Sequence, residues 1–118
     1  MASRKIEMYA KKQYELEEIK NKISEEFDKR KSRVEVPTEI LREIGDNKTL
    51  LLIYEKYFFR TNSHASLLIM LSEYKGYQSA DIIATGGKEL LFSWGAEDDL
   101  MQIGKEVLQD LGFQGKII

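Results

Sequence analysis

Two stretches of alternating polarity, residues 65–74 and 78–85, flank the dipeptide Lys75-Gly76 and constrain this chain more than any other feature. Glycine takes a positive φ at little steric cost, so the dipeptide predicts a two-residue hairpin loop. The resulting register places three apolar pairs on one face of the hairpin: Leu71–Ala80, Ile69–Ile82 and Leu67–Ala84. The first expected element is therefore an antiparallel hairpin with one apolar face.

Two other segments have the helical period. Apolar residues at positions 16, 19, 23 and 27 predict a helix over about residues 13–31, and those at 100, 103, 107 and 111 predict a second helix that ends at Gly112. The acidic run Glu97-Asp98-Asp99 suits the positive end of the second helix dipole. We expect a core built from these helix faces and the hairpin: Leu16, Ile19, Ile23, Phe27, Leu67, Ile69, Ile82, Leu100, Ile103 and Val107.

Further strands are expected over residues 4–10 and 33–36, which alternate, and over residues 49–60, which are rich in aliphatic and aromatic residues. Residues 90–92 form a shorter apolar piece, expected to be extended. Residues 37–45 allow two interpretations. Pro37 could begin a short helix, or a strand could run to a turn at residues 45–48, and we favour the strand because the turn composition is good.

The expected order is β-α-β-β-β-β-α. Strands joined by short turns are antiparallel, and two amphipathic helices can cover one face of the sheet that they form. We therefore predict an α+β fold with two layers, in which about five antiparallel strands carry both helices on one face. Its 118 residues suit a single domain, residues 1–118. The TATA-binding-protein-like topology has the same order, but this analogy implies no function.

Composition narrows the function classes. The chain has no cysteine and one histidine, so we expect no metal site and no cofactor. Its net charge of −2 argues against a nucleic-acid partner. No stretch is apolar enough for a signal peptide or a membrane span, so we expect no membrane association and a cytoplasmic location.

Candidate catalytic groups are few. His64 stands beside Asn62 and Ser63, where we expect a turn. The 97–99 acidic run is better explained by the helix dipole than by acid–base chemistry. The segment 85–88, Thr-Gly-Gly-Lys, lacks the first glycine and the final Ser/Thr of a phosphate-binding loop. We therefore expect no enzymatic activity.

The pieces YEKYFFR, ASLLIMLSEY, ATGGKELLF and FSWGAEDDL, all between Ile53 and Leu100, resemble a family of small uncharacterised bacterial proteins, a domain of unknown function. The resemblance covers roughly the C-terminal two-thirds of the chain. It implies a bacterial cytoplasmic protein, and because the family has no assigned activity it identifies no site residue.

The second face of the sheet suggests a function. On the predicted hairpin, Leu68, Met70 and Ile83 form an apolar centre opposite the core, rimmed by polar residues. Such a patch is typical of an interaction surface. Our first hypothesis is a non-enzymatic binding or assembly module that forms a homodimer through this patch. The alternative is a carrier or sensor that holds a small apolar ligand between sheet and helices, gated by Gly86, Gly87 and Trp94.

Overall fold

The computed structural model describes residues 3–30, 34, 37–58, 63–86 and 96–115. Within these ranges the elements follow the predicted order β-α-β-β-β-β-α. The strands are β1 (Ser3–Lys11), β2 (Thr38–Ile44), β3 (Asn47–Phe58), β4 (Ser63–Tyr74) and β5 (Tyr77–Gly86). The helices are α1 (Leu16–Lys29) and α2 (Ala96–Asp110), and the α+β class is confirmed.

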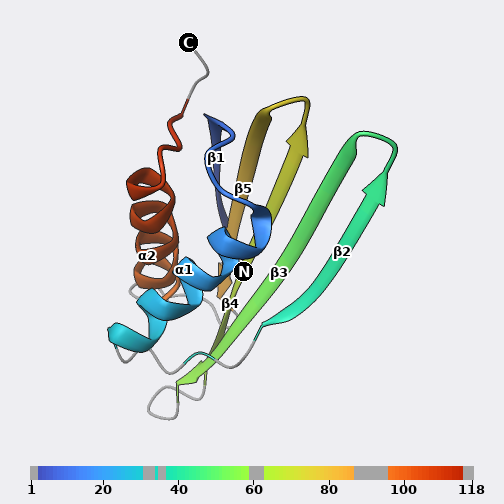
Figure 1. Cartoon of the computed structure of the whole chain (residues 1–118). Coiled ribbons are helices and arrows are strands. Elements are labelled where there is room, and N and C mark those ends of the chain that lie inside the picture. Colours follow the sequence, from blue (N-terminus) through green and yellow to red (C-terminus); the bar gives the residue numbers. More distant parts are fainter. Residues whose placement is uncertain (1–2, 31–33, 35–36, 59–62, 87–95, 116–118) are drawn as a thin grey trace.

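All five strands belong to one antiparallel sheet in the order β1-β5-β4-β3-β2. Strands β2 to β5 form a meander, and β1 pairs with the outer side of β5 although most of the chain separates them. Figure 1 shows that the two tight turns, between β2 and β3 and between β4 and β5, lie at the same end of the sheet. We call this the hairpin end.

The β4–β5 register confirms the sequence prediction. Leu71 pairs with Ala80, Ile69 with Ile82 and Leu67 with Ala84. The loop is the dipeptide Lys75-Gly76, in which both residues have positive φ, 49° and 84°. This is the backbone that two-residue hairpin turns require, because its twist matches that of the strands.

Of the two interpretations of residues 37–45, the strand is correct. β2 ends at Ile44, and the turn is the dipeptide Gly45-Asp46, shorter than the predicted 45–48 turn. Gly45 has a φ of 58°, which explains why a glycine stands there. Of the expected strand 33–36, only residue 34 lies within the described ranges.

Both helices lie on one face of the sheet, to its left in Figure 1. The ten residues predicted for the core are all buried, which confirms that prediction. Gly104 of α2 faces the sheet, and a methyl group at that position would stand 3.6 Å from the side chains of Leu67 and Ile69, which is ordinary van der Waals contact. Gly112 ends α2 with a φ of 97°, and the amide of Phe113 donates to the carbonyl oxygen of Leu108 at 2.9 Å.

Two expectations are corrected. The first helix begins at Leu16 rather than near residue 13. At this start the amide of Glu15 donates a hydrogen bond to Glu18 Oε1 at 3.0 Å. His64 lies within strand β4, opposite Tyr57, and not in a turn. Ser63 and His64 pair with Phe58 and Tyr57 of β3, so both belong to the strand. The expected extended piece at residues 90–92 lies outside the described residues.

Candidate functional site: the open face of the sheet

The face of the sheet that carries no helix, which we call the open face, consists of rows of side chains that cross all five strands. In an antiparallel sheet, directly paired residues project to the same side. One row therefore runs Lys5, Ile83, Leu68, Ile53, Thr38, and the next runs Glu7, Asp81, Met70, Leu51, Ile40.

These two rows bring the predicted patch together and enlarge it. Leu68 pairs with Ile83, and Met70 lies opposite Asp81, as the hairpin register predicted. The register also adds three aliphatic side chains that sequence reasoning did not assign: Leu51, Ile53 and Ile40. We call the six residues Ile40, Leu51, Ile53, Leu68, Met70 and Ile83 the apolar band. Five are half-buried by their neighbours, and Ile40 is 45% exposed.

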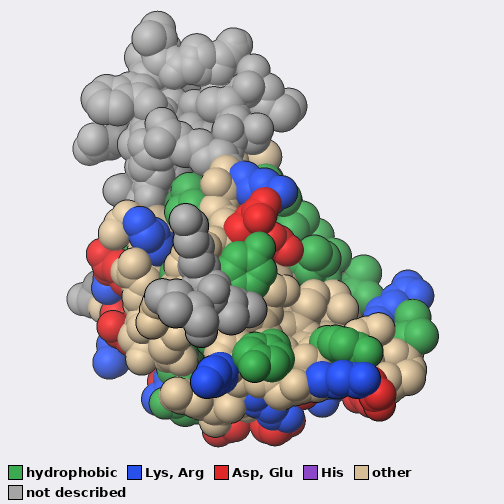
Figure 2. Space-filling view, turned by 90° about the horizontal axis from the view of Figure 1, so that it is seen from above, with side chains coloured by type: hydrophobic (Ala, Val, Ile, Leu, Met, Phe, Trp, Pro, Cys, Tyr) green, Lys and Arg blue, Asp and Glu red, His purple; other side chains and the backbone are tan. Residues whose placement is uncertain are grey.

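Figure 2 views the molecule from the hairpin end and shows hydrophobic side chains along the flank away from the helices, next to a small group of acidic and basic side chains. Charged residues of the open face stand beside the apolar band rather than inside it. Lys5 Nζ lies 2.8 Å from Glu7 Oε2 on strand β1. This ion pair raises the pKa of Lys5 and lowers that of Glu7. Neither of these two charges therefore requires an external partner.

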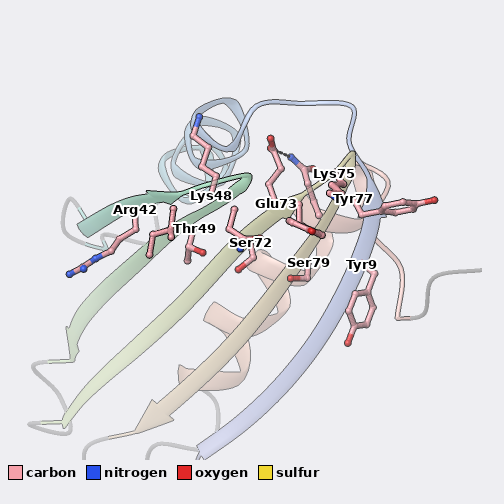
Figure 3. A pocket seen from close by; sticks show the side chains of 13 residues that line it. Tyr9, Arg42, Lys48, Thr49, Ser72, Glu73, Lys75, Tyr77 and Ser79 are labelled. Atoms are coloured by element: carbon pink, nitrogen blue, oxygen red, sulfur yellow. Dashed lines mark hydrogen bonds between the residues drawn. The ribbon is translucent and has the colours of Figure 1, made fainter.

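Nearer the hairpin end the open face becomes polar. The next row runs Tyr9, Ser79, Ser72, Thr49, Arg42, and we call it the hydroxyl row. Figure 3 shows these five side chains side by side on successive strands, while Lys48 and Glu73 point toward the side of the helices. The hydroxyl row lines a hollow of about 770 Å³ together with residues next to the two tight turns, among them Tyr74, Lys75 and Tyr77.

The other candidate residues do not form a site in the described part of the chain. Gly86 is the last residue of β5, whereas Gly87 and Trp94 lie outside the described residues, as do the side chains of Glu97, Asp98 and Asp99. The carrier hypothesis therefore stays a prediction. His64 is exposed, with Nε2 3.9 Å from Glu55 Oε1.

Among the described residues, no three His, Cys, Asp or Glu side chains converge as metal ligands. Over the same residues, neither helix has the length and apolar character that a membrane span needs. The expectations of no metal and no cofactor stay predictions.

A protein-family model matches nearly the whole chain. A family model described as "Family of unknown function (DUF6054)" matches residues 1–112. The chain belongs to this family. The DUF6054 match includes β1 and α1, so it extends well beyond the C-terminal two-thirds on which the resemblance in the sequence was based.

The other comparisons add little to the DUF6054 assignment. No curated protein matches the chain significantly. Among solved structures, the crystal structure of TTHA0849 from Thermus thermophilus aligns over 92% of each chain, with 13% identity and a TM-score of 0.34. A likeness this weak carries no functional argument.

Proposed function

We propose that this protein is a non-enzymatic assembly module that forms a homodimer through the open face of its sheet. The observation that carries the proposal is the apolar band, six aliphatic side chains in two adjacent rows on a face that neither helix covers. Full burial of an exposed aliphatic side chain of this size is worth about 1.5–3 kcal/mol, and because five of the six are already half-buried, covering the band gains only part of that for each of the five.

The size of the face suits a dimer. Five strands spaced about 4.8 Å apart, with a rise of about 3.3 Å per residue over the nine residues of β1, give roughly 700 Å² for each protomer. Stable specific interfaces bury about 800 Å² on each partner. Two sheets can also stack face to face with interleaved side chains, as they do in β-sandwiches.

The charges of the open face favour a second copy as the partner. Among the described strand residues, three cations and three anions lie on this face: Lys5, Lys11, Arg42, Glu7, Glu55 and Asp81. A neutral face does not repel its own copy, whereas a strongly charged partner would find no complementary field there. In a symmetric dimer the same patch serves both subunits.

The variant Met70→Asp tests the proposal, because Met70 belongs to the band and lies on β4, the middle strand of the sheet. A carboxylate there would be buried without a partner in the dimer but solvated in the monomer, so it would disfavour the dimer. We expect the wild type to sediment as a dimer at micromolar concentration and Met70→Asp to sediment as a folded monomer, with an unchanged circular-dichroism spectrum.

Leu41→Asp is the matched control. Leu41 lies on β2 but on the helix side of the sheet, where it is 47% exposed, and its replacement should leave the dimer intact. Wild-type protein that is monomeric at several hundred micromolar would contradict the proposal. So would dissociation by Leu41→Asp as complete as that by Met70→Asp, because it would place the interface on the β2 edge.

A further inference from the structure

The hollow at the hairpin end has the size of a ligand site. Its volume of about 770 Å³ lies within the roughly 300–1,000 Å³ typical of small-molecule pockets. It is adjacent to the apolar band, since Ser72 lies two residues after Met70 on β4. Its lining differs from that of the band, because hydroxyl, aromatic and basic groups predominate and Ile44 is the aliphatic side chain among the lining residues.

The floor of the hollow presents side-chain hydroxyls to which no group in the described part of the chain is hydrogen-bonded. Ser79, Ser72 and Thr49 are half-buried on three neighbouring strands, and within the described residues no side chain or backbone group bonds their hydroxyls. The fourth hydroxyl, that of Tyr9, donates to Glu7 Oε1 at 3.3 Å. Three hydroxyls side by side can donate to and accept from one polar ligand.

One end of the hydroxyl row is cationic. Arg42 closes the row on β2, and over the described ranges no carboxylate pairs with its guanidinium. Glu73 also lines the hollow, but its carboxylate accepts hydrogen bonds from Lys12 and Gln78 on the helix side of the sheet. Arg42 therefore offers an unopposed guanidinium fork, which suits carboxylate and phosphate oxygens.

The opposite side of the hollow is aromatic. Tyr74 and Tyr77 are directly paired next to the turn, and they are 49% and 47% exposed. The Nζ atom of Lys75 stands 5.2 Å from the centre of the Tyr74 ring. Exposed aromatic rings favour another flat ring in offset or edge-to-face packing, and the ammonium group of Lys75 beside them favours a negative charge nearby.

We propose that this hollow binds a small organic anion that contains an aromatic ring. Its anionic group pairs with Arg42, its ring packs against Tyr74 or Tyr77, and the hydroxyl row bonds the polar atoms between them. Arg42 and Tyr74 stand two strands apart and two residues apart along the strands, roughly 12 Å, so a bare inorganic anion is too short to use both. All the groups that it uses belong to one chain, but the hydroxyl row is part of the open face, so the ligand and a second copy that covered this whole face would compete for it.

Titration with 1-naphthyl phosphate, followed by amide nuclear magnetic resonance, tests the inference. We expect saturable shifts confined to residues 42–49, 72–79 and the end of β1. Neutral 1-naphthol and inorganic phosphate should each bind at least tenfold more weakly, because each lacks one of the two recognised groups.

Two variants and one control complete the test. Arg42→Gln and Tyr74→Leu should each weaken binding by tenfold or more, whereas Lys22→Gln, which removes a cation on α1, should leave it unchanged. The inference is overturned if no saturable shifts occur below ~1 mM, which is already weak binding. It is equally overturned if 1-naphthol binds as tightly as its phosphate, or if folded Arg42→Gln retains full affinity.

Discussion

The side-chain amide of Gln78 donates a hydrogen bond of 2.8 Å to the backbone carbonyl oxygen of Tyr14. Gln78 is only 3% exposed, and the same nitrogen lies 3.0 Å from Glu73 Oε1. The contact joins β5 to the segment that links β1 with α1. A buried amide with two acceptors thus fixes where the first helix leaves the sheet.

Gln78→Leu should therefore destabilise the fold. The substitution leaves the Tyr14 carbonyl without its donor, and an unsatisfied buried polar group costs about 1–3 kcal/mol. Urea unfolding measures this loss. Gln102→Leu on α2 is the control, because Gln102 is exposed and its replacement should change the free energy of unfolding by less than about 0.5 kcal/mol. Equal effects of the two variants would contradict the prediction.

Glu73 should make stability depend on pH. Burial alone would raise the pKa of Glu73, but hydrogen bonds from Lys12 and Gln78 outweigh it and hold the pKa below its ordinary value of 4.5. The carboxylate is therefore favoured in the folded state, so its contribution is present at neutral pH and is lost as the pH falls through the folded-state pKa.

Glu73→Gln tests this sign. The wild type should be more stable than the variant at neutral pH, and the gap should narrow as the pH falls below the ordinary carboxyl pKa of 4.5, measured by urea unfolding between neutral and acidic pH. A gap that stays constant over the whole range would show that the Glu73 carboxylate does not carry the effect.

Tyr54→Phe should cost about 0.5–1.5 kcal/mol, the usual worth of one hydrogen bond. The Tyr54 hydroxyl lies 3.0 Å from Ser24 Oγ, and burial raises the pKa of the phenol, so it stays protonated. Its ring, 4.9 Å from that of Phe27 between centroids, is kept in the variant. A double-mutant cycle with Ser24→Ala isolates the bond, and strict additivity of the two losses would contradict it.

Gly104→Ala should stabilise the protein by about 0.5–1 kcal/mol, because alanine is the better helix former and its methyl group fits at ordinary contact distance. Gly112→Ala should do the opposite, since its φ of 97° strains any side chain. Thermal unfolding of both variants compares the signs. Destabilisation by Gly104→Ala would mean that α2 cannot accept even a methyl group against the sheet.

Local sequence signals predicted most of the fold. The turn Lys75-Gly76 predicted the β4–β5 register. That register in turn predicted three residues of the apolar band, Leu68, Met70 and Ile83. The face of β3 could not be predicted in isolation, because Leu50, Leu51, Leu52 and Ile53 are all apolar and do not alternate. The pairing of Leu51 with Met70 resolves it, and that contact depends on the neighbouring strand.

The hydroxyl row escaped prediction for a different reason. Tyr9, Thr49, Ser72 and Ser79 are ordinary polar residues in sequence, and they become neighbours only when the strand order is known. In particular, no local pattern predicts that β1 pairs with β5. The turn compositions fix only pairs of strands that follow one another in the chain.

The pairing of β1 with β5 affects the order in which the strands can pair during synthesis of the chain. Each pair of consecutive strands from β2 to β5 can form its hydrogen bonds as soon as the second strand has left the ribosome. Strand β1 (Ser3–Lys11) cannot pair until β5 (Tyr77–Gly86) has been synthesised. Contacts so distant in sequence form late and slowly. Until β1 pairs with β5, the growing chain has an unpaired strand near its N-terminus, and β5, once made, has an open edge. That interval is when the growing chain is most exposed to mispairing with other molecules.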